Sequence, residues 1–530
     1  MSTERLDFPA VSLVCGQGRD LPSQAARLRA SWLEGREGRA PLLLVALLWG
    51  RECPDVVRQL QAYLDALFVD YACTPAGWSE AQAVRQVLAA LNQQLFRQQQ
   101  AGRGGIQLSA GLLLLQGDEV QFFQAGAIGL LRYREGSLQS LAGREGMQLG
   151  GQAELALVQH HLPLSPGEVL LLAPQPLLDV ADLHSFRTGC AGLDTEQMQP
   201  LLRPLLQAPG AAVLLLPGVA EPLPPAAPRE PWPALVAQPG QQLDGWTLLG
   251  GCAFGPPGRV FRAMDERGRE AILWLAEQAA DEAFWQREWA LRRSAASSLA
   301  QVLSAHQPRR HAFMLFEPAP PGMLSLLDWQ AAHGPLEALS LLALLEQLIA
   351  AVRALQRRGM QGLWLDPRNI LVGGNGRLLL LPEHAALLPG VPRQPLPAEA
   401  LPLAPELRQG QMADGRADQF ALAALAYWLF CGRWPEVARA DAGKNCGYVP
   451  LAQFSARLPA GWDGVLARAL APQAEARFEA LSEFHQALLQ PLQAQAPQLR
   501  SGRRQQPWQV VMVGLLVVQL ALGLWLSLNG

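Results

Sequence analysis

The feature that most constrains this chain is a proline-rich run near its middle. Eight prolines lie between Pro217 and Pro239, including the stretch EPLPPAAPREPWP. Proline fixes φ and lacks a backbone N–H, so such a run is typical of an extended spacer and not of a helix or inner strand. The 530 residues also exceed one ordinary core. We therefore predict two folded units, at about 1–216 and 241–490, joined by a linker at 217–240.

The first unit mixes two hydrophobic periodicities. Short apolar runs such as PLLLVALLW, LSAGLLLLQ and EVQFFQAG predict strands, and longer patterns such as CPDVVRQLQAYLDALFVDY predict helices. The turn signals QGDE and REGS separate the central strands, which favours an antiparallel meander. The unit is therefore predicted to be α+β.

The second unit begins with strand-like pieces and ends with helical ones. WTLLGG, GRVFRAM and EAILWLA come first, and PLEALSLLALLEQLIAAVRALQRR and ADQFALAALAYWLFCG follow. A small β-rich part before a larger helical part indicates a two-lobed order.

The charges and cysteines exclude several classes of function. The net charge is −3 and no Lys/Arg-rich stretch stands out, so we expect no nucleic-acid partner. The chain has one lysine, Lys444, so an activity that needs an ammonium group has a single candidate. Seven scattered cysteines without a CxxC pair, and eight histidines without metal spacing, predict reduced thiols and no metal site.

The C-terminal residues predict a membrane anchor. From Trp508 to Gly530 there is no charged residue, and about 20 apolar residues can cross a ~30 Å hydrocarbon layer. Arginines precede the run, which favours a cytoplasmic N-terminal side, and the start MSTERLDFPA lacks the apolar core of an export signal. We expect a stem at 491–507 and a transmembrane helix at 508–528. The alternative is a buried core helix.

The second unit resembles a protein kinase. LLGGCAFGPPGRVFRA is similar to the glycine-rich phosphate loop, with Gly255 and Gly258 at the last two glycine positions and two prolines between them. REAILWLA is similar to the strand that carries the phosphate-pairing lysine, and Trp274 stands at the lysine position. An indole is a neutral donor where phosphate chemistry needs a cation.

The strongest match to the kinase family is RRGMQGLWLDPRNILVGGNGRLLLL, which is similar to the catalytic loop and the hairpin after it. The resemblance places Trp364 at the catalytic aspartate, Asp366 at the loop lysine and Asn369 at the second metal ligand. Pro382 stands at the magnesium-holding aspartate. Asp366 and Glu383 are each displaced by one or two positions, so we expect neither to substitute. Gly255, Gly258 and Asn369 would be a vestigial cofactor set.

Other kinase positions keep their residues. The resemblance implies a structural pair between Glu406 of LPLAPELRQG and Arg477 of APQAEARFEALSEF, and a buried Asp418 that opens the central helix. Glu288 matches the glutamate that would pair with the missing lysine, and we expect it to be a solvated helix carboxylate.

The first unit resembles a metal-dependent type 2C phosphatase, whose fold is an α/β/β/α sandwich. The resemblance rests on strand spacing in PLLLVALLWGRECPDVVRQL, VQFFQAGAIGLLRYREGSLQSL and LSPGEVLLLAPQPLLDV. It places Leu47, Gln175 and Gln24 at metal aspartate positions and keeps Gly126. Hard cations need oxygen ligands, so no dinuclear site is expected. Asp179 remains and is expected to be a helix cap.

These resemblances together predict a bacterial phosphatase–kinase protein with both sites degenerate. We expect a single-pass protein of the inner membrane, with its folded units in the cytoplasm. It would be a scaffold or allosteric regulator in Ser/Thr phosphorylation signalling that binds an active kinase, a phosphatase or their substrate. No cofactor is expected. The alternatives are an active Ser/Thr kinase that uses unorthodox residues with ATP and magnesium, and a non-catalytic sensor of a nucleotide or another ligand.

Overall fold

The computed structural model describes most of the chain up to residue 495. The described residues are 2–35, 37–102, 105–141, 147–223, 231–382, 396–397, 400–411, 414–439, 447–455 and 458–495. They fall into two compact units, whose bounds differ from those of the two units predicted from the sequence. The first joins Met1–Trp329 to Ala350–Leu396, and the second joins Gln330–Ile349 to Pro397–Gly530.

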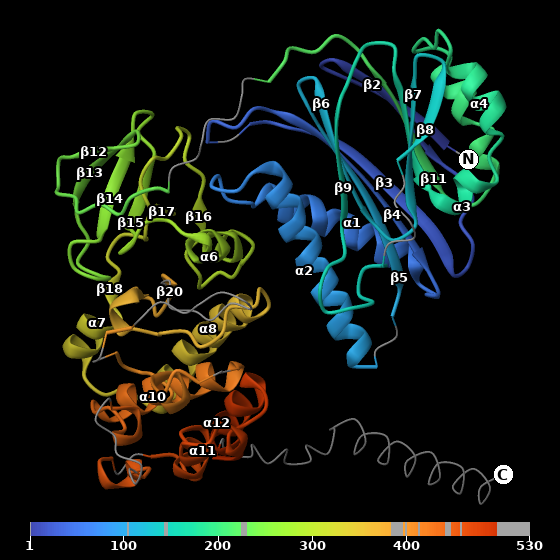
Figure 1. Cartoon of the computed structure of the whole chain (residues 1–530). Helices are drawn as coiled ribbons and strands as arrows, with labels where there is room; N and C mark the ends of the chain where they lie inside the picture. Colours follow the sequence, from blue (N-terminus) through green and yellow to red (C-terminus); the bar gives the residue numbers. More distant parts are fainter. Residues whose placement is uncertain are drawn as a thin grey trace, which may run out of the picture. The chain divides into compact units, whose positions relative to one another are not determined.

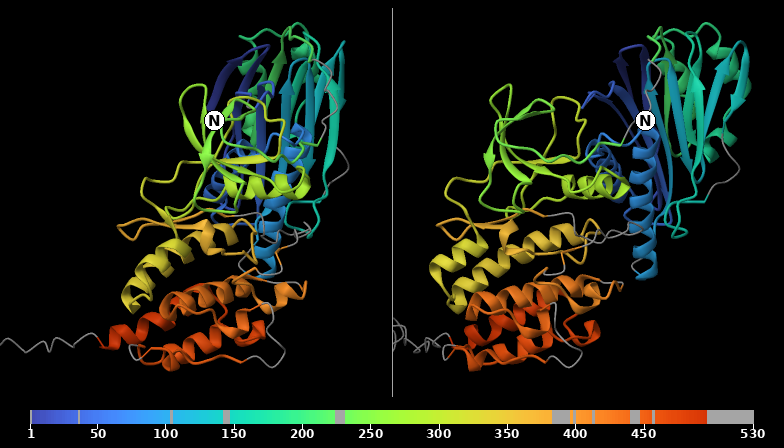
Figure 2. Two further views of the ribbon diagram at one scale, coloured as in Figure 1. Left: turned by 90° about the vertical axis from the view of Figure 1, so that its left-hand side faces the viewer. Right: turned by 60° about the vertical axis from the view of Figure 1, so that its left-hand side comes forward.

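The N-terminal part of the first unit holds two antiparallel sheets (Figure 1; Figure 2). One sheet has the strand order β1-β2-β11-β10-β7-β8 and the other β3-β4-β5-β6-β9. The strands of the first sheet are β1 (Ser2–Phe8), β2 (Val11–Gln17), β11 (Ala211–Pro217), β10 (Val169–Pro174), β7 (Ile128–Arg134) and β8 (Ser137–Ser140). Those of the second are β3 (Gln24–Leu33), β4 (Leu42–Arg51), β5 (Gln107–Gln116), β6 (Glu119–Ala125) and β9 (Val158–Pro163).

Helices cover the outer faces of the two sheets. A core of aliphatic side chains, among them Leu47, Leu113 and Leu172, fills the space between the sheets. α1 (Val56–Ala72) packs on β3 and β4 and against α2 (Glu80–Gln100). On the other sheet, a second core includes Phe186 and Met198 of α4 (Leu183–Cys190) and α5 (Met198–Leu202), after α3 (Gln175–Asp179). The layer order of this part is thus α/β/β/α.

The predicted meander is wrong at its centre. QGDE does form the β5–β6 hairpin and REGS the β7–β8 hairpin, in the registers Gln116↔Glu119 and Arg134↔Ser137. Between the two hairpins, however, the chain passes from one sheet to the other. Gly126 lies there with φ of +75°, a left-handed value that costs glycine little.

The first unit also contains a six-stranded antiparallel sheet of order β12-β13-β14-β15-β17-β16, with its own core around Trp246, Phe261 and Phe313. Helix α6 (Glu282–Arg292) follows β15, and Asp281 caps it by accepting a hydrogen bond from the Phe284 N–H. The strands are β12 (Gln242–Leu243), β13 (Trp246–Gly251), β14 (Val260–Asp265), β15 (Glu270–Leu275), β16 (Val302–Leu303) and β17 (Phe313–Phe316).

A small three-stranded sheet completes the first unit. It orders β18 (Leu324–Ser325), β19 (Ile370–Val372) and β20 (Leu378–Leu380), and the short helix η2 (Pro367–Asn369) leads into β19. The predicted catalytic loop lies directly before β19 of this sheet, so the sheet positions its residues.

The later part of the predicted linker is not a free spacer. The Ala280 and Ala312 N–H groups donate to the carbonyls of Trp232 and Pro233, each over 2.8–3.0 Å. Leu235 and Ala237 join the core of the six-stranded sheet. The apolar residues between the prolines therefore hold this segment on the fold. The free energy gained by burying their side chains outweighs the conformational freedom expected of a proline-rich spacer.

The second unit is helical. Its central helix α10 (Gly415–Cys431) is buried on nearly all sides, and Gly432 in the left-handed region ends it. The other helices are α9 (Pro405–Arg408), α11 (Trp462–Ala469) and α12 (Leu481–Gln495), with short turns at η3 (Glu436–Ala438), η4 (Leu451–Gln453) and η5 (Ala474–Ala476). α7 (Leu326–His333) and α8 (Ala338–Gln356) have residues in both units.

One helix in the described part of the chain is long and apolar enough to cross a membrane. It is α8, and 56% of its most apolar window is buried inside the fold, as in a core helix. The predicted transmembrane segment at 508–528 and the stem before it lie outside the described residues.

Candidate functional site

The glycine-rich loop between β13 and β14 contacts the predicted catalytic loop directly. Gly255 and Gly258 have φ of +77° and +73°, so both occupy the left-handed region. The Gly255 N–H donates to the carbonyl oxygen of Arg368 over 2.9 Å. A backbone donor that would face phosphate oxygens in a nucleotide cradle is therefore engaged by the protein itself.

Trp274 fills the position matched to the phosphate-pairing lysine. It lies on β15 between Val260 of β14 and Met314 of β17, and 6% of it is exposed. Its ring lies 6.2 Å from that of Phe316. The indole Nε1 has no hydrogen-bond partner among the described residues. The side chain at this position is thus a flat apolar ring with one neutral hydrogen-bond donor.

The Asp366 carboxylate of the predicted catalytic loop is paired within the loop itself. Asp366 is 5% exposed, accepts a hydrogen bond from the Arg368 N–H at the start of η2, and forms an ion pair with the Arg368 guanidinium at 2.6 Å. Asn369 is 1% exposed, and its backbone bonds to Asp366 and Leu381. Trp364 is half-buried. The buried carboxylate thus neutralises an arginine beside it, and Glu383 lies outside the described residues.

A cavity lies where β15, β17 and α6 meet. Its walls include Trp274, Phe284, Arg287, Phe316 and Pro382. The cavity volume is about 30 Å³, room for roughly two water-sized groups. Ligand pockets usually have about 300–1,000 Å³, so a nucleotide does not fit this space as it stands.

Glu288 is wholly buried, so the expectation of a solvated carboxylate is wrong. Its Oε1 accepts hydrogen bonds from Arg309 over 2.7 Å and from Arg292 over 3.0 Å. Glu37 binds the same two arginines, each over 3.0 Å. Burial alone raises the pKa of Glu288, but the charges of Arg309 and Arg292 hold it below its usual value.

This cluster belongs to a contact between α6 and the first two helices of the chain. The Trp289 Nε1–H donates to the Asp70 carbonyl over 2.9 Å, and Arg293 pairs with the Asp70 carboxylate at 3.1 Å. At the other end of α6, Glu282 accepts from Trp78 and from Gln82. The helix at the edge of the cavity is therefore held by residues from α1, α2 and the loop after β3.

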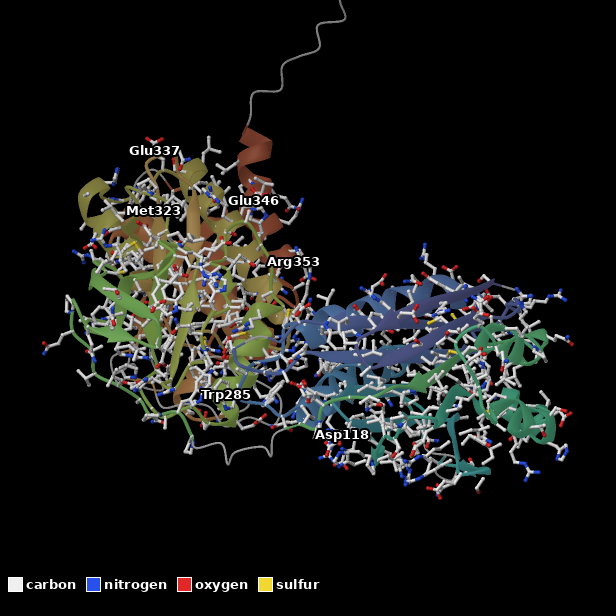
Figure 3. The ribbon with its side chains drawn as sticks, turned by 90° about the horizontal axis from the view of Figure 1, so that it is seen from above. Asp118, Trp285, Met323, Glu337, Glu346 and Arg353 are labelled. Atoms are coloured by element: carbon white, nitrogen blue, oxygen red, sulfur yellow. The ribbon has the colours of Figure 1, made fainter. Side chains whose placement is uncertain are left out.

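Trp285 of α6 packs against Gly77 in the loop between α1 and α2. A Cβ atom added at Gly77 would lie 2.1 Å from the Trp285 ring. Trp232 from the linker packs edge-on against the same ring, at 4.5 Å between centroids. Trp285 is labelled in Figure 3. Only a residue without a side chain fits at position 77.

The residues matched to the phosphatase metal positions lie in three elements, β3, β4 and α3. Leu47 lies inside the sandwich opposite Leu28, whereas Gln24 begins β3, four residues before Leu28. Gln175 begins α3 and donates from Nε2 to Asp179 over 2.8 Å. No group of three or more His, Cys, Asp or Glu side chains within the described ranges could hold a metal ion.

The expected structural pair of the second unit is formed. Arg477, 1% exposed, donates from both terminal nitrogens to the two oxygens of Glu406, over 2.7 and 2.9 Å. Asp418 is wholly buried near the start of α10. Bidentate geometry of this kind is among the stronger side-chain interactions.

Comparison with known proteins supports the kinase resemblance over part of the chain. No family model matches. Serine/threonine-protein kinase PknI of Mycobacterium tuberculosis is 36% identical over 155 residues, which are 28% of this chain and 23% of the relative. Serine/threonine-protein kinase Pkn1 of Myxococcus xanthus is 29% identical over 208 residues, 35% of this chain and 28% of the relative. This part of the chain is homologous to bacterial serine/threonine protein kinases.

The chain spans about a quarter of the length of these relatives. Among solved structures, the kinase domain of PknI from M. tuberculosis is similar, with a TM-score of 0.39 and 26% identity over 48% of this chain and 99% of that domain. A double mutant of the same kinase domain has a TM-score of 0.40 and 25% identity over 48% of this chain and 99% of the domain.

Sequence reasoning did not find the buried acid–base cluster. Glu37 and Arg309 are 272 residues apart, and each is an ordinary charged residue in a polar stretch. The one available signal was Glu288 itself, a carboxylate among several arginines. Its burial depends on a contact that no local pattern describes.

Proposed function

We propose that the chain is a kinase-like signalling protein that acts through protein contacts and not by phosphate transfer. The observation that carries this proposal is Trp274 at the lysine position, behind a loop whose Gly255 N–H is already bonded to Arg368. Homology to serine/threonine kinases supports the signalling context.

Phosphate transfer depends on positioning and on charge placed against the phosphates. Three of the groups it needs are replaced: the cation by Trp274, the base by Trp364 and the main metal carboxylate by Pro382. Asn369 alone cannot hold a metal ion, and Asp366 is paired with Arg368. The cleft therefore keeps a shape without the charges that the reaction uses.

The N-terminal sandwich fits a role as a binding partner of α6. We propose that it descends from a metal-dependent phosphatase and has lost that chemistry, since Gln24, Leu47 and Gln175 replace carboxylates. The ion pairs of Glu37 and Asp70 with Arg309, Arg292 and Arg293 support a structural use of the domain.

The proposal includes a place in the cell. Residues 508–528 would anchor the chain in the bacterial inner membrane as a single pass, with both folded parts in the cytoplasm. A membrane-tethered protein of this kind would bind an active kinase, a phosphatase or their substrate, and it would require neither ATP nor magnesium.

A phosphate-transfer assay tests the proposal. The full chain in detergent micelles is incubated with γ-labelled ATP, magnesium or manganese, and casein as acceptor. We expect the same background label for the wild type and for the Asp366→Ala and Asn369→Ala variants. Label that appears with the wild type and is lost in either variant would refute the proposal.

A further inference from the structure

We propose that the cavity between β15, β17 and α6 binds a small monocarboxylate, with Arg287 and Trp274 as its donors. The inference concerns the same cleft as the proposed function. It rests on the proposed function in one respect: Trp274 stands where the kinase family has a lysine, so no lysine side chain occupies the space beside α6. It adds a ligand that the proposed function does not require.

Arg287 is a buried cation with no hydrogen-bond partner in the part of the chain that the structure describes. Its exposed fraction is 0%, and none of its three guanidinium nitrogens has a hydrogen-bond partner among the described residues. An unpaired buried charge costs several kcal/mol, so a side chain in this state is strongly selected against unless something binds it. The side chain lines the cavity, which is therefore where its partner would lie.

The carboxylates near the cavity that the structure describes have other partners. Glu288, the next residue, accepts from Arg292 and Arg309. Asp281 raises the pKa of Arg287 by its charge, but its Oδ1 caps α6 at Phe284. Glu277 also lines the cavity, yet its side chain is 61% exposed and pairs with Arg259 at 3.6 Å.

The guanidinium nevertheless stays charged at neutral pH. Burial lowers the pKa of Arg287 to about 10, which is still three pH units above neutrality. An anion in the cavity would therefore meet a full positive charge in surroundings of low polarity, where the attraction is stronger than in water.

A second donor points to the same ligand. The Trp274 Nε1–H is buried, unpartnered among the described residues, and in the wall of the same cavity. A carboxylate has two oxygens, so it can accept from the arginine with one and from the indole with the other. One ligand group thus satisfies both donors.

Charge, shape and volume select the class of anion. Arg259, the other guanidinium in the cavity wall, pairs with Glu277, so Arg287 leaves one positive charge for the ligand. A phosphate would bring a second negative charge and a third oxygen into walls of Phe284, Leu291, Met314 and Phe316. The volume of about 30 Å³ has room for the carboxylate group itself, so the body behind that group must be small, of one or two carbons. Acetate and propionate are therefore the probes of choice.

The test measures the unfolding midpoint of the full chain in detergent against the concentration of acetate or propionate. Saturating carboxylate should raise the midpoint of the wild type by about 2–4 °C. Propionamide, which has the same shape without the charge, should have no effect. Arg287→Met should abolish the response, and the control Arg58→Met, at a side chain 85% exposed on α1, should keep it.

Two further measurements keep the inference falsifiable. Without ligand, Arg287→Met should raise the midpoint by about 2–4 °C, because an apolar chain replaces an unpaired charge. Trp274→Phe, which keeps a ring and removes the N–H, should weaken carboxylate binding about fivefold. It serves as the test if Arg287→Met does not fold.

Several results would overturn the inference. They are a flat carboxylate response of the wild type, an equal response of Arg287→Met, or a response to inorganic phosphate or ATP in place of carboxylates. A fall in the midpoint of Arg287→Met without ligand would show that the arginine is already satisfied. None of these results concerns label transfer, so the proposed function fails or survives separately.

Discussion

At the scale of single residues, the buried charges of α6 lie at Arg287 in the cavity wall and in the cluster around Glu288. Trp274 and Trp364 are large and neutral where the kinase resemblance places ions, whereas Glu288 and Arg309 form a buried acid–base cluster. The sequence alone could predict the first of these features, the two tryptophans, because it depends on residue identity within motifs. It could not predict the second, which depends on a contact between residues 37, 288 and 309.

Removing one charge from the cluster should destabilise the protein. Glu288→Gln keeps the shape but leaves Arg309 and Arg292 to share the carboxylate of Glu37, and we expect a loss of about 3 kcal/mol. Urea unfolding followed by tryptophan fluorescence measures the loss. The control Glu119→Gln, at a pair with a side chain 42% exposed, should change stability by less than about 0.5 kcal/mol. Equal effects of the two variants would contradict the account.

The same residue predicts a pH dependence. The folded pKa of Glu288 lies below the ordinary 4.5, so the unfolded chain binds the proton more readily. Its stabilising contribution is therefore complete above about pH 4.5 and is lost as the pH falls through the folded pKa. The difference between wild type and Glu288→Gln should be constant from pH 8 to 5 and shrink below 4.5. A difference that grows on acidification would be inconsistent with this assignment.

At the scale of elements, α6 is the element on which the account depends. One face of it meets the cavity through Phe284, Arg287 and Leu291. Trp289 and Arg293 meet Asp70 of α1, and Glu282 meets Gln82 of α2. Strands such as β13, β4 and β6 could be predicted almost to the residue, because their apolar runs are bounded by turn residues. The passage of the chain between sheets at Gly126 could not, because hairpin signals do not say which sheet a hairpin joins.

Filling the space at Gly77 should loosen α6. Gly77→Ala places a methyl group 2.1 Å from the Trp285 ring, so the loop must shift away. We expect the amides of α6 to exchange hydrogen at least about tenfold faster, measured by mass spectrometry. The control is Gly464→Ala, where an added Cβ has no neighbour within 4 Å. Unchanged exchange in α6 would show that the contact does not hold the helix.

The pair of Glu406 and Arg477 is a second test at this scale. Arg477→Met leaves the Glu406 carboxylate, 11% exposed, without its bidentate partner, and we expect a loss of about 3 kcal/mol in the second unit. Glu406→Gln with Arg477→Met should cost less than the sum of the single changes. Additive losses in this double-mutant cycle would mean that the two side chains are not coupled.

At the scale of the whole molecule, part of the chain is homologous to serine/threonine protein kinases, and we propose that its reaction centre is lost. The proline run lies between the sandwich and the six-stranded sheet, and its later part packs on that sheet through Leu235 and Ala237. The membrane anchor at 508–528 remains a prediction from composition, in the region that the structure does not describe.

The most direct test of the central claim is magnesium-dependent binding of ATP to the full chain. The unfolding midpoint is measured in detergent with ATP, with and without magnesium. We predict no magnesium-dependent rise, because no cation stands at position 274 and the Gly255 N–H is bonded to Arg368. A rise of several degrees that needs magnesium and is lost in Asn369→Ala would contradict the claim that the cleft no longer handles nucleotide.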